Sequence, residues 1–208
     1  MQKSEVITIL IAAILLGLII SFPSYLLILI SIVYMATILF VNILTKKIVA
    51  YNLESNVRVK FWDIYQWGFE TSSHFKKPVT MLWLPLLLSL ISKGSISWLA
   101  MLEFDAKPRV ERAAKRHGYY RYKAMTDWHI AIIAASGIIV NLVLALICYP
   151  VAGLGQFAKL NIYFALWSLL PLGGLDGSKI FFGSRALWFV LAVMALLFFI
   201  ASLMIIVV

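Results

Sequence analysis

An acidic residue lies in a long apolar stretch near the C-terminus, in the run NIYFALWSLLPLGGLDGSK that ends at Lys179. The run starts as an apolar helix, but Pro171 cannot donate a backbone hydrogen bond, so the helix must break or kink there. Asp176 follows among glycines, at or near membrane depth. A charge at the bilayer centre costs about 2.5–3.5 kcal/mol on insertion scales, which makes such an acid a candidate functional residue. Irregular backbone at that depth must be buried in protein or line a cavity.

The composition places the rest of the chain in a membrane as well. The chain is 63% hydrophobic and only 13% charged, with a mean hydropathy of +0.97. These values predict an all-α polytopic membrane protein that forms one integral membrane domain over residues 1–208, with the lipid bilayer as its surroundings. The net charge of +9 is best explained by a cytoplasmic face rich in lysine and arginine, not by binding to nucleic acid.

Apolar runs predict about five membrane crossings in a compact helical bundle. Between the second and third crossings, the alternation of apolar and polar residues over 48–52 and 57–63 predicts a short β-hairpin or small sheet around a turn at residues 52–56. The expected crossings are residues 6–22, 25–44, 129–149, 160–180 and 186–208.

The stretch 78–104 is long enough to cross but has Lys93-Gly94 at its middle. Basic residues are frequent on both sides of it, in regions 46–77 and 105–127, and a single crossing would put these regions on opposite faces. A re-entrant hairpin that turns near Lys93-Gly94 keeps both basic regions in the cytoplasm. We therefore favour the re-entrant hairpin over a full span.

The arrangement Asn161, Pro171, Leu175-Asp176-Gly177 resembles the NxxPxxxLDG-type motif of the site-2 proteases, which are intramembrane zinc metallopeptidases. The run AASGIIVN, ending at Asn141, is similar to the family's A-G-P-x-x-N pattern on the preceding span. The segment 116–123 also resembles archaeal members. The resemblance spans about residues 35–185 and implies a site-2-protease-like bundle in the plasma membrane of a prokaryote.

The family's HExxH helix supplies two zinc-binding histidines and a glutamate that acts as general base. The segment NILTKKIVA, which starts at Asn42, is similar to the family's HELAHKIVA and has Asn42, Ile43 and Lys46 at those positions. Asp176 would be the third ligand if a metal were bound. If the family's site positions are carried over to this chain in this way, we expect no catalytic residue, no metal site and no cofactor.

Other metal ligands are few. His74 and Glu70 are four residues apart, and a makeshift zinc site with Asp176 is one interpretation of them, but we favour two polar residues on a wet interfacial segment. His117 is expected in a solvated loop. His129 is expected at the membrane interface, two residues after Asp127, which we predict to cap the third crossing.

Three functions remain open. The first is a pseudoprotease that binds membrane protein partners or their transmembrane segments. The second is an active intramembrane metalloprotease with an atypical ligand set. The third is a small transporter or channel with Asp176 at a broken helix. The loss of the HExxH residues favours the first.

A buried carboxylate without a partner is costly. The resemblance brings position 46 next to Asp176, so we expect Lys46, Asn42 or both to hold the carboxylate within hydrogen-bond distance. The competing possibility is that backbone N–H groups of the neighbouring glycines hold it instead.

Overall fold

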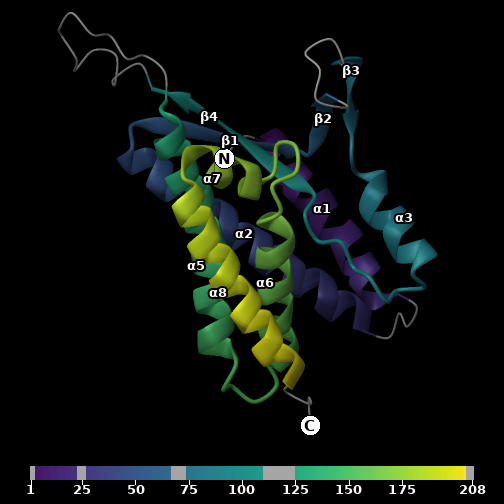
Figure 1. The fold of residues 1–208 in the computed structure, drawn as a ribbon. Helices are drawn as coiled ribbons and strands as arrows, with labels where there is room; N and C mark the ends of the chain where they lie inside the picture. The colour runs from purple at the N-terminus through teal and green to yellow at the C-terminus, as the bar shows by residue number, and fades with distance from the viewer. Residues whose placement is uncertain (1–2, 23–26, 67–73, 110–124, 205–208) are drawn as a thin grey trace, which may run out of the picture.

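The computed structural model of the 208-residue chain describes residues 3–22, 27–66, 74–109 and 125–204. This part of the chain is mostly helical, with its short strands gathered at one end (Figure 1). Four of the helices, α1, α2, α5 and α8, are long and apolar enough to cross a membrane. The helices are α1 (Lys3–Ser21), α2 (Ile28–Asn52), α3 (Trp83–Ile91), α5 (Asp127–Cys148), α6 (Gly155–Ser168), α7 (Asp176–Gly183) and α8 (Arg185–Met204).

The four long helices and α6 pack around one apolar core. Leu16 of α1, Met35 and Ile38 of α2, and Ile138 of α5 are fully buried in it. By contrast, the side of α8 that faces away from the core exposes large apolar side chains such as Phe189 and Leu197. An apolar outer surface of this kind suits a bundle whose surroundings are lipid.

The stretch 160–180, expected as the fourth crossing, is not one continuous helix. Helix α6 ends at Ser168, residues 169–175 form an irregular loop, and α7 starts at Asp176. The break expected at Pro171 is confirmed, and the crossing of the membrane by this broken stretch stays a prediction. Pro171 has no N–H to continue the helical hydrogen bonds, so the chain leaves the bundle axis before Asp176.

The β structure differs from the predicted hairpin. Residues 48–52 are the last turns of α2, and strand β1 (Ser55–Phe61) pairs antiparallel with β4 (Leu102–Pro108). A second two-stranded sheet joins β2 (Asp63–Gln66) to β3 (His74–Thr80). The expected small sheet is confirmed, but a hairpin that turns at residues 52–56 is wrong, because residues 48–52 continue the long apolar helix α2.

The stretch 78–104 runs away from the end of the molecule that carries the strands and then returns to it (Figure 1). Strand β3 leads into α3, the chain turns at Lys93 and Gly94, which both have positive φ, and an extended segment leads back to β4. This hairpin is attached through a second small core made of Trp62, Met81, Trp98, Ala100 and Leu175. The turn lies where the sequence placed it, and its insertion into a membrane remains a prediction.

The arrangement predicts that β1, β4 and the start of α1 share one side of the membrane. Glu5 of α1 accepts a hydrogen bond from the backbone of Val59 in β1, and the loop between α5 and α6 lies at the opposite end (Figure 1). In a Cys148→Ala background, an impermeant maleimide should label Arg58→Cys and Lys107→Cys from the same side. Tyr149→Cys should be labelled from the other side only. Labelling of Arg58→Cys and Lys107→Cys from opposite sides would contradict the re-entrant hairpin.

Candidate functional site

Helix α2 presents a polar face towards the middle of the bundle. Asn42 and Lys46 are one helical turn apart and therefore lie on the same face, with Ile43 beside them. All three are buried, and Lys46 is only 6% exposed. Because α2 continues to Asn52, Lys46 is held inside a regular helix and not at a frayed end.

Asp176 is positioned by the break between α6 and α7. It is the first residue of α7, where a carboxylate interacts favourably with the positive end of the helix dipole. Ser178 fixes the preceding loop, because its hydroxyl lies within hydrogen-bond distance of the carbonyls of Gly173 (2.6 Å) and Leu175 (2.7 Å). Asp176 is 3% exposed.

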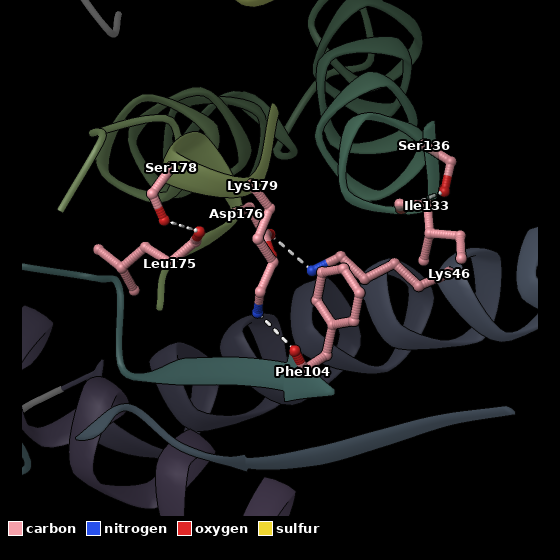
Figure 2. A network of polar contacts seen from close by, with 8 residues as sticks. All are labelled: Lys46, Phe104, Ile133, Ser136, Leu175, Asp176, Ser178 and Lys179. Atoms are coloured by element: carbon pink, nitrogen blue, oxygen red, sulfur yellow. Dashed lines mark hydrogen bonds and ion pairs between the residues drawn. The ribbon is translucent and has the colours of Figure 1, made fainter. Parts of the chain in front are cut away.

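These two elements meet in a buried ion pair (Figure 2). Lys46 Nζ lies 2.6 Å from Asp176 Oδ2, so the expected contact between them is confirmed. Asn42 does not share the contact, because its Nδ2 atom has no hydrogen-bond partner in the protein. Asp176 Oδ1 is also without a partner, so the alternative in which glycine N–H groups hold the carboxylate is wrong.

Phe104 of strand β4 contacts two lysines of the site. Lys179 of α7 donates a hydrogen bond to the carbonyl of Phe104 (Figure 2), and the ammonium groups of Lys179 and Lys46 lie 4.1 and 5.2 Å from the centroid of the Phe104 ring. Cations over an aromatic face are attracted to it. Phe104 therefore links α2, β4 and α7.

Glu103, next to Phe104 in β4, is buried and pairs with Lys60 of β1 at 2.8 Å. Burial alone would lower the pKa of Lys60, but hydrogen bonds with Glu103 and Tyr65 raise it above its usual value. The sequence reasoning missed Glu103. The available signal was an isolated acid directly after the apolar run WLAML, in a strand that reads LEFDAK.

Glycines let these elements approach. A Cβ on Gly137 of α5 would lie 2.5 Å from Lys46 Cε, and a Cβ on Gly174 would lie 1.8 Å from Glu103 Oε2. Both distances are shorter than real Cβ contacts, so a side chain at either glycine would force the end of the Lys46 or the Glu103 side chain to move. Gly137 belongs to the AASGIIVN run that the sequence analysis singled out.

The remaining motif residues support the backbone and do not bond to the ion pair. Asn161 is fully buried and donates to the carbonyl of Phe157 one turn earlier in α6, at 2.9 Å. Asn141 of α5 is fully buried and neither of its amide atoms has a partner in the protein. Pro171 is exposed in the loop between α6 and α7, and Gly177 lies against the backbone of that loop.

The residues present do not fit zinc. Zinc prefers about four nitrogen, sulfur or oxygen ligands, whereas this site offers the carboxylates of Asp176 and Glu103, each already paired with a lysine ammonium group that repels a cation. Among the described residues, no group of three or more His, Cys, Asp or Glu could hold a metal. The makeshift ligand set cannot be placed, because Glu70 and the side chain of His74 lie outside the described residues, as does His117.

His129 lies apart from Asp176, at the start of α5. Its ring contacts the hydroxyl of Thr126, and Thr126 is the N-cap residue of α5, with its hydroxyl accepting from the backbone of His129. The expectation that Asp127 caps this helix was wrong, since Asp127 is its first helical residue. Ser, Thr and Asp are all favourable N-cap residues, and here Thr126, one position before Asp127, is the N-cap.

No protein-family model, no curated protein and no solved structure matches this chain. The fold and the site define a mostly helical protein with four apolar helices of membrane-spanning length and a buried lysine–aspartate pair at a broken helix. The similarity to site-2 proteases stays a resemblance carried by the residues quoted above.

Lys46→Met should destabilise the protein, because it leaves the Asp176 carboxylate buried and unpaired. Breaking a buried ion pair by removing one partner costs roughly 3–5 kcal/mol. Adding Asp176→Asn should recover much of the loss, which a double-mutant cycle on unfolding in detergent would measure. Lys107→Met, at an exposed position of β4, is the matched control and should be nearly neutral. A double variant as unstable as the sum of the single variants would contradict the pairing.

Gly177→Ala should also destabilise the site. A Cβ at position 177 would lie 2.0 Å from the carbonyl oxygen of Leu169, which is backbone and cannot rotate away. Overpacking of this kind costs typically about 1–3 kcal/mol. Gly155→Ala is the control, because nothing lies within 4 Å of the added atom there. Thermal unfolding should separate the two variants, and equal stability would show that α7 can move away from the α6–α7 loop.

Proposed function

We propose that this protein is a catalytically inactive relative of the site-2 proteases that binds transmembrane segments of other membrane proteins. The observation that supports this is the convergence of three positions. Asn42, Lys46 and Asp176 are the positions that the resemblance aligns with zinc ligands, and all three are buried and line one small cavity. Lys46 and Asp176 are separated by 130 residues, so composition and periodicity alone do not imply that they meet.

The chemistry at these positions favours binding over catalysis. Ile43 stands where the family's general base would be, and its side chain cannot accept a proton. The Lys46 ammonium supplies next to Asp176 the positive charge that a metal ion would supply. The proposed protein thus keeps the charge balance of a metal site and the surrounding helices, without a group that activates water.

The proposed location is the plasma membrane of a prokaryote, with the end that carries β1, β4 and α7 in the cytoplasm. The four apolar helices of spanning length support a membrane protein. The basic residues near the strand end support this orientation through the positive-inside rule. The proposed partners are membrane proteins with a single transmembrane span, or transmembrane segments of the length of one span.

A binding assay in vesicles tests the proposal. A single-span apolar peptide of about 20 residues would carry a fluorescence quencher at its centre. Trp98 and Trp167, whose ring centroids are 4.5 Å apart, serve as reporters because Ala100 and Ser168, two residues or fewer away in sequence, line the cavity. We expect saturable quenching that unlabelled peptide reverses, and a peptide that mass spectrometry finds intact.

A variant that restores the family's ligands provides the matched control. Asn42→His, Ile43→Glu and Lys46→His together should bind one equivalent of zinc, and adding Asp176→Asn should weaken that binding. Cleavage of the peptide by the unaltered protein, lost with Asp176→Asn, would replace the pseudoprotease proposal with the atypical metalloprotease. Quenching that does not saturate would contradict the binding of transmembrane segments.

A further inference from the structure

A small cavity lies beside the Lys46–Asp176 pair, enclosed by α2, α6, α7 and strand β4. Its volume is about 20 Å³. A cavity holds one water molecule when it offers roughly 10–15 Å³ or more to a water-sized sphere, so this one has room for a single molecule of that size. Its walls combine apolar side chains, including Met101 and Phe164, with the polar side chains of Asn42, Glu103 and Asp176.

Each of those three polar side chains has one buried atom without a hydrogen-bond partner in the protein. The atoms are Asn42 Nδ2, Glu103 Oε2 and Asp176 Oδ1, and the three residues are between 2% and 4% exposed. A buried polar atom left unsatisfied costs about 1–3 kcal/mol, and such atoms are rare in native proteins. Because all three residues line the same cavity, a ligand in it is a candidate partner for all three atoms.

The charges around the cavity indicate that the ligand is neutral. Lys46 and Lys60 each pair with one of the two cavity carboxylates, Asp176 and Glu103, at 2.6 and 2.8 Å. An added cation would be repelled by the ammonium groups, and an added anion by the free carboxylate oxygens. A neutral ligand with one acceptor and two donors matches one amide N–H and two carboxylate oxygens.

We infer that the cavity binds one water molecule, which accepts a hydrogen bond from the Asn42 amide and donates to Asp176 Oδ1 and Glu103 Oε2. Three partners are typical for a buried water. This water joins the Lys46–Asp176 and Lys60–Glu103 pairs into one network. Because Lys60 also contacts the exposed Asp105 at 3.3 Å, the network runs from the core of the bundle to the surface of the sheet. The inference does not depend on the binding of transmembrane segments.

Two buried methionines allow a direct test. Met101 lines the cavity, whereas Met35 lies in the main apolar core, and they are 2% and 0% exposed. A short X-ray pulse converts bound water into hydroxyl radicals, which oxidise a neighbouring methionine to the sulfoxide. Mass spectrometry of the irradiated protein should find Met101 oxidised much faster than Met35. Equal rates would show that the cavity is dry and would overturn the inference.

A variant identifies the residue that holds the water. Asn42→Leu removes the amide while keeping a side chain of similar size, and most of the rapid oxidation of Met101 should be lost. Ser136→Ala is the control, because the Ser136 hydroxyl bonds to the carbonyl of Ile133 within α5 and does not line the cavity (Figure 2). Oxidation of Met101 that persists in folded Asn42→Leu protein would overturn the assignment of the water to this amide.

Discussion

The buried ion pair between Lys46 and Asp176 is the constraint on which the site depends. Removing two charges from water is costly, and the attraction between them offsets this only when the geometry is good and the remaining polar atoms are bonded. The 2.6 Å contact depends on α2 staying helical past Lys46, on α6 ending before Pro171, and on the close approach of α5 to the Lys46 side chain at Gly137. Three distant parts of the sequence are therefore fixed by one contact.

The sequence predicts the parts of the fold that have a strong local cause. The break near Pro171 follows from a missing backbone donor, and the turn at Lys93-Gly94 follows from a charge and a glycine within an apolar run. The Lys46–Asp176 contact could be predicted for a different reason. Only the resemblance indicated it, because Lys46 aligns with a zinc-binding histidine of the family's HExxH segment. Without that resemblance, the chain offers many other lysines as partners for Asp176.

The features that the sequence does not predict depend on contacts between distant segments. Helix α2 continues through Lys47, and this lysine pairs with Glu5 of α1 at 2.7 Å, a contact that no pattern within residues 44–52 reveals. Strand β1 pairs with β4, beyond the α3 hairpin, and not with its neighbour in sequence. Glu103 becomes a site residue only through that pairing, which also explains why sequence reasoning overlooked it.

The separation of Lys46 from Asp176 along the chain also affects how the protein is made. A ribosome adds about 5–20 residues per second, so Asp176 emerges on the order of ten seconds after Lys46. During that interval α2 enters the membrane with an unpaired lysine, whose long side chain can reach towards the headgroups. Glu5 and Lys47 emerge much closer together, so their pair is available to hold α1 and α2 together first. The nascent chain can therefore form the Glu5–Lys47 pair before the Lys46–Asp176 pair.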